Sequence, residues 1–355
     1  MKLRPRHQHC RLDLVTRRGH EYLSLENELL RVTFVLTKGA DVVEFRHKPS
    51  DIDALWHSPQ RLNPPGTQIP TMALSRGSFF DYYPGGWQEV LPAGGGPCTY
   101  NGAELGLHGE AMLLPWEAEV VDDAPERVVV RLSVELRRTP FVLERTVSLE
   151  EGQLSIGWQG RLSNAGEQAL AFMWGQHAAF GEPFIEPGCE IDLPPARVQT
   201  LAKVSAATRY APNQEATWPY LRAQDGTMAR ADRVLEKTAR THDSYTIIPQ
   251  EGWFAIRNPQ RDLGFVMSWD HAVFPYLWTW QVYGGFWDFP YYGRAYALAL
   301  EPFSSPAGSL DMNIKRGTVK TLEPGQNLVL ALRAGFFVGA AAPIRGVDGD
   351  GHLLR

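Results

Sequence analysis

Several features on which many proteins depend are scarce or missing in this sequence. It contains only three cysteines, Cys10, Cys98 and Cys189, which are odd in number and widely spaced. We therefore expect no disulfide framework, and without a C-x-x-C pair we expect no structural zinc. No apolar run approaches the roughly 20 residues that a membrane-spanning helix needs. The first residues also lack the apolar segment of a secretory signal, so a cytoplasmic location is expected.

Positive charge is limited as well. The 35 Lys and Arg residues are outnumbered by 40 Asp and Glu residues, which gives a net charge of −5, and no basic block occurs. Binding to nucleic acid needs a dense Lys/Arg surface that displaces counterions, so we expect no nucleic-acid partner. Because the sequence has no long apolar run, we expect no membrane partner either. Apolar residues make up 44% of the chain and charged residues 21%, which is typical of a globular protein rather than a disordered one.

Extended helical patterns are also rare, whereas strand patterns are clear. Apolar and polar residues alternate along residues 128–137, 141–149 and 154–162, and turn sequences separate the three segments. Such alternation predicts an antiparallel meander with one solvated face. Residues 201–240 are the most compatible with helix, but Pro212 and Pro219 interrupt them, so we expect a loop with one or two short helices there. The fold class predicted is all-β, a large antiparallel sandwich.

Aromatic residues are concentrated in one segment. Residues 274–296 hold 11 of the 39 aromatic residues of the chain. Aromatic side chains favour half-buried strands, and they also stack on the apolar faces of sugars. We expect about half of this segment to pack in the core and leave open whether the rest lines a binding cleft.

Four short strings carry groups that could take part in chemistry. They are residues 85–92 with 106–111, residues 174–181, residues 242–245 and residues 297–302. In the last of these, Glu301 ends an apolar strand and precedes Pro302. A charge at such a position is costly unless it has a purpose.

The order and spacing of these strings resemble the aldose 1-epimerase (galactose mutarotase-like) superfamily over nearly the whole chain. The opening hairpin around residues 26–32, followed by the Gly-Ala turn of residues 38–41, also resembles that family. The string around His177 and the aromatic segment differ from typical mutarotases, which indicates a divergent branch. The resemblance implies one β-supersandwich domain over residues 1–355, with its core at about 20–340 and a tail at 341–355. It also implies a sugar as the small-molecule substrate and no metal or organic cofactor.

The resemblance further implies roles for individual residues. Glu301 corresponds to the catalytic glutamate and His177 to the second histidine motif. His108 corresponds to the first histidine motif and Asp243 to a sugar-binding aspartate. Further candidates for substrate contact are Arg76, Gln176 and Trp174.

These residue types suit the opening of a hemiacetal ring. The anomeric hydroxyl must lose a proton while the ring oxygen gains one, and a carboxylate base paired with an imidazolium acid performs both transfers. Imidazole suits the acid because its ordinary pKa of about 6.5 makes both forms accessible. We therefore expect Glu301 to be the base and His177 the acid, with His108 and Asp243 positioning hydroxyl groups.

Other interpretations remain open at this stage. Each candidate could be structural, with His177 a buried neutral residue and Glu301 paired with Arg294. His108, Glu110 and His177 could form a two-His, one-carboxylate metal site. An epimerase for a hexose phosphate or acidic sugar would need cleft arginines, for which Arg76, Arg222 and Arg294 are candidates. A carbohydrate-binding protein without turnover is a third possibility, although binding alone requires no acid–base pair.

Overall fold

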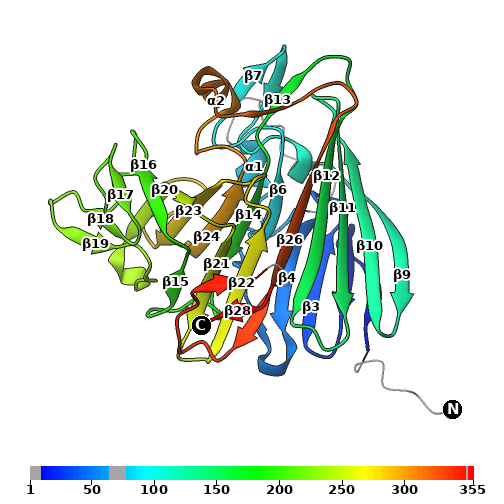
Figure 1. Ribbon diagram of the computed structural model, residues 1–355, viewed down its shortest axis with the longest axis horizontal. Coiled ribbons are helices and arrows are strands. Elements are labelled where there is room, and N and C mark those ends of the chain that lie inside the picture. Colours follow the sequence, from blue (N-terminus) through cyan, green and yellow to red (C-terminus); the bar gives the residue numbers. More distant parts are fainter. Residues whose placement is uncertain (1–8, 64–76, 349–350) are drawn as a thin grey trace.

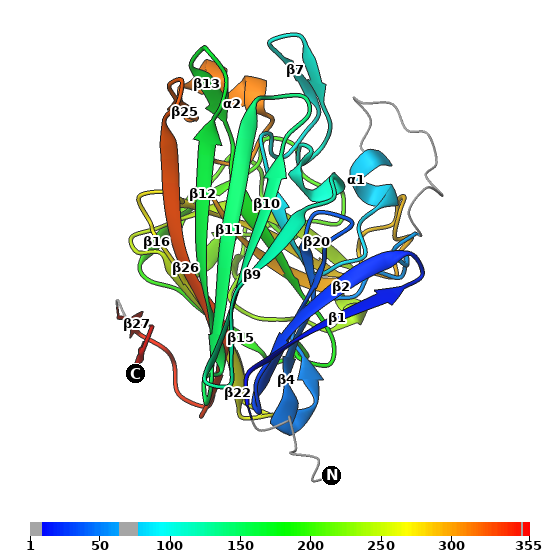
Figure 2. The same cartoon turned by 90° about the vertical axis from the view of Figure 1, so that its right-hand side faces the viewer.

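Two large antiparallel sheets dominate the fold (Figures 1 and 2). The structure is a computed structural model that describes residues 9–63, 77–348 and 351–355. The first sheet has the strand order β1–β2–β3–β4–β6–β14–β24–β23–β20–β16–β17, and β5 pairs with β4. Its strands are β1 (Arg11–Arg17), β2 (His20–Glu26), β3 (Leu30–Val35), β4 (Asp41–His47), β5 (Ile52–Asp53), β6 (Trp87–Val90), β14 (Gly175–Phe180), β16 (Ala196–Thr200), β17 (Glu215–Thr217), β20 (Thr241–Pro249), β23 (Tyr276–Tyr283) and β24 (Tyr296–Phe303).

The second sheet has the order β15–β21–β22–β26–β12–β11–β10–β9. Its strands are β9 (Glu117–Ala124), β10 (Arg127–Glu135), β11 (Phe141–Glu150), β12 (Ser155–Asn164), β15 (Glu190–Asp192), β21 (Trp253–Asn258), β22 (Leu263–Trp269) and β26 (Asn327–Val338). The predicted meander corresponds to β10, β11 and β12. Val128 pairs with Leu149, and Leu143 with Leu162, so the apolar residues of the three strands share one face.

The remaining regular elements of the described residues are four two-stranded sheets and several short helices. The pairs are β7 (Cys98–Tyr100) with β8 (Ala103–Leu105), β13 (Leu170–Phe172) with β25 (Lys320–Leu322), β18 (Tyr220–Arg222) with β19 (Met228–Arg230), and β27 (Gly346–Val347) with β28 (Leu353–Leu354). The α-helices are α1 (Gly77–Asp81) and α2 (Leu310–Arg316), and the 3-10 turns are η2 (Lys48–Ser50), η3 (Ala111–Leu113) and η4 (Lys237–Ala239). The all-β prediction is confirmed. No helix among the described residues is long and apolar enough to cross a membrane.

The main core lies between the two sheets. Trp87 of β6 stacks on Trp158 of β12 with ring centres 4.7 Å apart, and Phe45 of β4 meets Phe265 of β22 at 5.2 Å. Side chains of the first sheet that alternate with these core residues face the other way, toward loops and α1. That second face of the first sheet carries the candidate site.

Residues 201–240 were expected to form a loop with one or two short helices, and one short helical element is present, but the short strands there were not expected. This segment forms β17, β18 and β19, and its only described helical element is the 3-10 turn η4. The short strands extend from the β16 edge of the first sheet and lie at the left of Figure 1. Pro212 and Pro219 cannot continue a helix, and the Asp225-Gly226 turn, with Gly226 at φ 88°, connects β18 to β19 instead.

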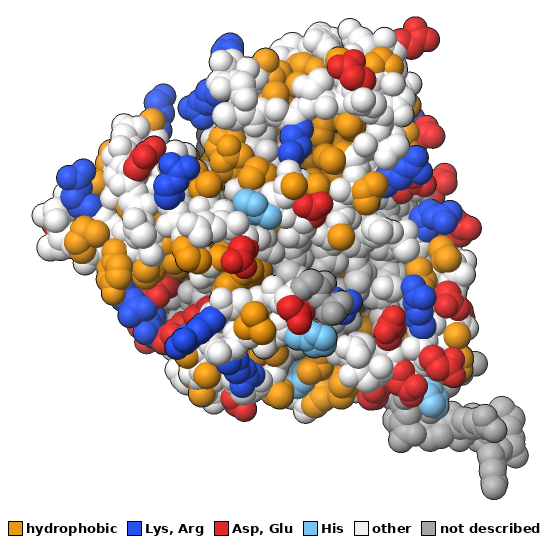
Figure 3. Space-filling model, in the orientation of Figure 1, with side chains coloured by type: hydrophobic (Ala, Val, Ile, Leu, Met, Phe, Trp, Pro, Cys, Tyr) orange, Lys and Arg blue, Asp and Glu red, His pale blue; other side chains and the backbone are white. Residues whose placement is uncertain are grey.

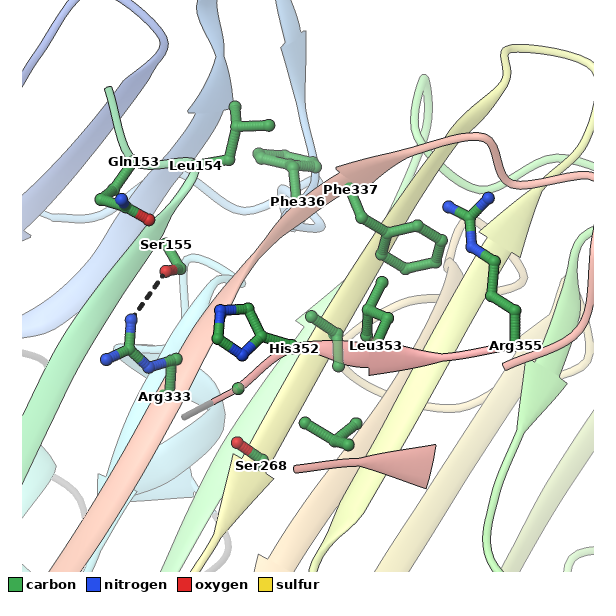
Figure 4. A pocket seen from close by; sticks show the side chains of 13 residues that line it. Gln153, Leu154, Ser155, Ser268, Arg333, Phe336, Phe337, His352, Leu353 and Arg355 are labelled. Atoms are coloured by element: carbon green, nitrogen blue, oxygen red, sulfur yellow. Dashed lines mark hydrogen bonds between the residues drawn. The ribbon is translucent and has the colours of Figure 1, made fainter. Parts of the chain in front are cut away.

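The C-terminal segment covers part of the outer face of the second sheet. Ile344 and the partly buried Val347 and Leu353 pack against Trp253 and Phe337. The segment borders a cavity of about 330 Å³ between β12, β22 and β26, where Arg333 donates a hydrogen bond to Ser155 (Figure 4). Figure 3 shows that acidic and basic side chains are interspersed on the face of the molecule seen there. None of the predicted site residues that the structure describes lines this cavity.

Candidate active site

Two neighbouring strands bring the proposed acid and base together. His177 lies on β14 and Glu301 on β24, and the flanking pair Ala178–Leu300 sets their antiparallel register. Residues opposite one another in such a pair project from the same face. Nε2 of His177 lies 3.7 Å from Oε1 of Glu301. The two side chains are 6% and 4% exposed, so both are deeply buried without being completely sealed.

His108 joins this pair from a loop. It has a positive φ of 62°. The next residue must be glycine, because Gly109 has a φ of 75° and a side chain there would collide with the Leu91 carbonyl. The His108 ring lies edge-on to His177, with ring centres 5.1 Å apart. Its Nδ1 atom is buried and has no hydrogen-bond partner in the structure. The three residues expected to be closest to the chemistry thus lie together.

Aromatic side chains surround the pair, and we call Trp56, Phe79, Tyr83 and Trp280 the aromatic wall. Tyr83 places its hydroxyl 3.5 Å from Nδ1 of His177, and Phe79 of α1 packs on both Tyr83 and His108. Trp56 contacts Tyr83 and also Trp280 of β23. Small residues of the sheet pack in the same cluster as these rings. They are Ala179, Ala297 and Ala299.

Burial shifts the proton affinities of the pair in opposite directions. Removal from water raises the pKa of Glu301 to about 8. The same effect, assisted by the positive charge of Lys38, lowers the pKa of His177 to about 4 against a raising contribution from a backbone hydrogen bond. Burial, and then the charge of His177, lowers the pKa of His108. At neutral pH without ligand, the Glu301–His177 pair therefore holds one proton, on the carboxyl group.

A polar cluster borders His177 on its other side. Gln88 of β6 pairs directly with His177 across the two strands. Its amide nitrogen donates to Oδ2 of Asp41 at 3.2 Å and to the Gly85 carbonyl at 2.7 Å. Lys38 forms an ion pair with the same oxygen of Asp41. We call Lys38, Asp41 and Gln88 the polar clamp.

Asp243 is not brought to this site. On β20 it pairs with Gln281, whereas His242 pairs with Val282 on the face that carries the site. The Asp243 carboxylate accepts hydrogen bonds from Thr208 and from the backbone and guanidinium of Arg209. Because strand side chains alternate, Asp243 faces away from His177 and Glu301.

His242 occupies the site face instead. Its ring stacks on Phe286 with centres 4.5 Å apart, and the indole of Trp280 donates to its Nε2 at 3.1 Å. Burial lowers the pKa of His242 to about 4, against a raising effect of the Asp243 and Asp288 charges. A neutral imidazole here accepts the indole hydrogen bond, so this residue fixes the aromatic wall.

Gln176 and Trp174 also face away from the pair, contrary to the expectation of substrate contact. Both donate hydrogen bonds of 2.6 Å to Oε1 of Glu89, within the core between the sheets. Arg145 of β11 donates from the opposite sheet to the other oxygen of Glu89 at 3.3 Å. The rings of Trp116 and Trp158 flank its guanidinium. These groups hold β6 and β14 in place behind the site.

The remaining candidates lie elsewhere or outside the described residues. Arg76 is among the residues that the structure does not describe. Arg294 donates to the carbonyls of Pro290 and Tyr291 rather than to Glu301. Glu110 accepts from the backbone of residues 137 and 138. Among the described residues, no group of three or more His, Cys, Asp or Glu side chains could hold a metal ion.

The sequence interpretation missed several residues of this site, although the signal for two of them was present. Strand alternation in residues 241–249 places His242 and Asp243 on opposite faces of the sheet. The sequence therefore showed that only one of them can face the site, but not which one. Gln88 lay within a recognised string, and Lys38 and Asp41 within the opening hairpin. Only the pairing of β4, β6 and β14 shows that they adjoin His177.

Known structures share this fold. A protein from Klebsiella pneumoniae described as a "putative aldose 1-epimerase" matches with a TM-score of 0.73 and 20% identity, over 91% of this chain and 81% of that one. A galactose mutarotase-like protein from Clostridium acetobutylicum matches with a TM-score of 0.63 and 13% identity, over 93% and 99% of the two chains. A galactose mutarotase related enzyme from Lactobacillus acidophilus matches with a TM-score of 0.58 and 15% identity, over 91% and 99%. The predicted resemblance is thereby confirmed for the fold.

Comparison with curated proteins and with family models completes the assignment. No curated protein matches the chain. One family model matches residues 17–334, which is most of the sequence. The chain belongs to the family described as "Domain of unknown function (DUF4432)".

Proposed function

We propose that the protein is an aldose 1-epimerase-type isomerase that interconverts the α and β anomers of a sugar. The observation that carries the proposal is the approach of Glu301 to His177 on one face of the first sheet, at 3.7 Å. An acid and a base next to each other can serve two oxygen atoms bonded to the same carbon. Both the anomeric hydroxyl and the ring oxygen of a cyclic aldose are bonded to C1.

The reaction needs only these two groups. The carboxylate of Glu301 takes the proton of the anomeric hydroxyl, and the freed electron pair forms the C1=O double bond. The bond between C1 and the ring oxygen breaks, and the ring oxygen takes a proton from the His177 imidazolium. Rotation about the C1–C2 bond exposes the other face of the aldehyde. The reverse transfers then close the ring to the other anomer.

The buried pair suits this cycle because it keeps one proton throughout. Before ring opening the proton is on His177, and afterwards it is on Glu301. The second distribution is the one that burial favours in the ligand-free site, where the pKa of Glu301 is about 8 and that of His177 about 4. Both forms carry no net charge as a pair, so the site exchanges them without adding or releasing a proton. Such transfers typically contribute about 10²–10⁴-fold in rate.

The surrounding residues have supporting roles in this proposal. The Tyr83 hydroxyl, 3.5 Å from Nδ1 of His177, orients the imidazole. Nδ1 of His108 has no partner, which makes it available to a sugar hydroxyl. The aromatic wall supplies flat apolar surfaces of the kind on which pyranose rings stack. We assign no substrate contact to Asp243, Gln176 or Trp174.

Polarimetry of freshly dissolved single anomers tests the proposal. We expect the wild-type protein to accelerate the approach to equilibrium for at least one neutral aldose in a panel that includes glucose, galactose and mannose. The panel also includes hexose 6-phosphates and uronic acids, which test the acidic-sugar alternative. Binding of several sugars without acceleration of any would instead support a carbohydrate-binding protein.

A further inference from the structure

We infer that the polar clamp of Lys38, Asp41 and Gln88 binds two neighbouring hydroxyl groups of a neutral sugar and selects the substrate at the proposed active site. This inference rests on the proposed function and extends it to a substrate class and to residues that carry specificity. The clamp adjoins the acid–base pair because Gln88 pairs across strands with His177. Residues directly opposite on antiparallel strands have Cβ atoms about 5 Å apart.

The hydrogen-bonding capacity of the clamp is unfilled. Oδ1 of Asp41 and Oε1 of Gln88 are buried and have no partner in the structure. Both residues are 0% exposed. Burying polar atoms without partners is costly, so such atoms need an explanation. These two free acceptors belong to residues that hydrogen-bond to each other, and together they call for two donors from a ligand.

Lys38 supplies the complementary donors. An ammonium group has three N–H donors, and the recorded side-chain partner of Lys38 is Oδ2 of Asp41. Lys38 is 6% exposed, although lysine is rarely buried. A hydroxyl group both donates and accepts. Two hydroxyls could therefore donate to Asp41 and Gln88 while accepting from Lys38, which would fill both sets.

The local backbone is built to hold this arrangement. Gly39 has a φ of +69°, and a Cβ at this position would lie 2.6 Å from the Met112 carbonyl oxygen and closer still to Oδ1 of Asp41. Ala40 follows with a φ of 43°, and its carbonyl accepts a 2.6 Å hydrogen bond from Arg145. The turn that joins Lys38 to Asp41 thus depends on glycine and is anchored from the opposite sheet.

Charge indicates a neutral ligand. The Lys38 cation offsets the Asp41 anion. The charge of Arg145 also acts on Asp41, but Arg145 is itself paired with Glu89. A phosphate or carboxylate of the ligand would be repelled by the acceptor oxygen of Asp41. It would also gain little from Lys38, because Asp41 already compensates the positive charge of Lys38. Neutral hydroxyl groups satisfy all three members without introducing charge.

Binding of 1,5-anhydroalditols tests the inference without requiring turnover. The probes 1,5-anhydro-D-glucitol, -galactitol and -mannitol keep the ring and its other hydroxyls but cannot open. We would measure their dissociation constants by ligand-observed NMR, together with those of their monodeoxy analogues. For wild-type protein we expect binding of at least one probe, and a loss of about tenfold or more when one of two neighbouring hydroxyls is removed.

The variants assign that loss to the clamp. Asp41→Asn should weaken binding of the parent probe at least tenfold and reduce the penalty for the same deoxy positions to less than threefold. Glu44→Gln, which makes the same change on the same strand and disrupts an ion pair with Arg46, should leave both values unchanged. If Asp41→Asn does not fold, Gln88→Met serves as the second variant, because it removes both polar atoms of the amide while keeping the length of the side chain.

Several results would overturn the inference. These are an unchanged deoxy penalty in a folded clamp variant, a uniform weakening at every ring position, or no binding of any neutral probe by the wild-type protein. Tighter binding of 1,5-anhydro-D-glucitol 6-phosphate than of the neutral compound would also contradict it. Failure of the proposed function gives a different pattern: the neutral probes bind through the clamp, but no aldose changes its anomeric ratio faster.

Discussion

His177 and Glu301 face each other across neighbouring strands, with Nε2 of the imidazole 3.7 Å from Oε1 of the carboxyl group. The distance is slightly too long for a direct hydrogen bond. Each group therefore remains free to bond to a substrate oxygen. The pair is held from behind by the Glu89 network and in front by Tyr83. The function proposed here depends on this single relationship.

The pH dependence of activity should follow the proton count of the pair. Burial gives Glu301 a pKa of about 8 and His177 a pKa of about 4, so one proton is retained between these values. We expect kcat/KM to be level across neutral pH and to fall as the pH rises through about 8, where the proton is lost. Anomer exchange measured by NMR between pH 5 and 10 checks this. A fall centred near pH 6.5 would contradict it.

Stability should respond to pH through the same carboxyl group. The folded-state pKa of Glu301 is raised above its ordinary value of 4.5, so the folded protein binds this proton more tightly than the unfolded chain does. The contribution of this proton to the free energy of unfolding is complete below about pH 4.5 and is lost as the pH rises through about 8.

The variant Glu301→Gln lacks this titration. Relative to the variant, the wild-type protein should therefore lose unfolding free energy between pH 4.5 and 8, at up to about 1.4 kcal/mol per pH unit. Urea unfolding of both proteins at several pH values measures the difference. A difference that is constant with pH would show that Glu301 is not buried as described.

Asp243→Asn should affect the fold rather than the site. Asp243 is fully buried and accepts three hydrogen bonds from Thr208 and Arg209. Weakening a buried ion pair typically costs about 3 kcal/mol in unfolding free energy. KM and kcat of the folded variant should remain within about twofold of wild type at moderate temperature. An increase in KM without loss of stability would instead restore the sugar-binding role.

Arg145 should stabilise the fold because it compensates the buried charge of its partner Glu89. Both side chains are about 1% exposed, and removal of the cation leaves the carboxylate buried without its charge partner. We expect Arg145→Met to cost about 3–5 kcal/mol. The double variant with Glu89→Gln should recover part of this loss because it removes the orphaned charge. Thermal unfolding of the two single variants and the double variant measures the coupling. Additive losses would contradict it.

The sequence predicted the strand-rich architecture because alternation is a local property. Residues 128–162 show it clearly, and the three strands pair as the expected antiparallel meander. A loop with one or two short helices was expected in residues 201–240, because this region was the most compatible with helix although Pro212 and Pro219 interrupt it. Turn residues such as Gly226 favour short strand pairs in that segment, and this preference decided the outcome.

The site was only partly predictable because two things do not follow from the local sequence. They are which face of a strand points toward the site and which distant strands pair with each other. His177 and Glu301 were identified by motif order, but their adjacency depends on β14 lying next to β24. Gln176 was assigned to the substrate although it is the neighbour of His177 in a strand. Alternation places such neighbours on opposite faces, so this error was avoidable. The clamp could not be found without the pairing of β6 with β14.

The most direct test of the central claim is two-dimensional exchange NMR on an accepted aldose with three variants. Glu301→Gln and His177→Asn should each reduce the enzyme-dependent exchange rate between anomers at least 100-fold, at equal concentrations of folded protein. His271→Asn, which alters a histidine bonded to the Pro249 carbonyl away from the site, should exchange anomers at the wild-type rate. If either Glu301→Gln or His177→Asn retains the wild-type exchange rate, the acid–base pair is not the catalyst and the proposed function fails.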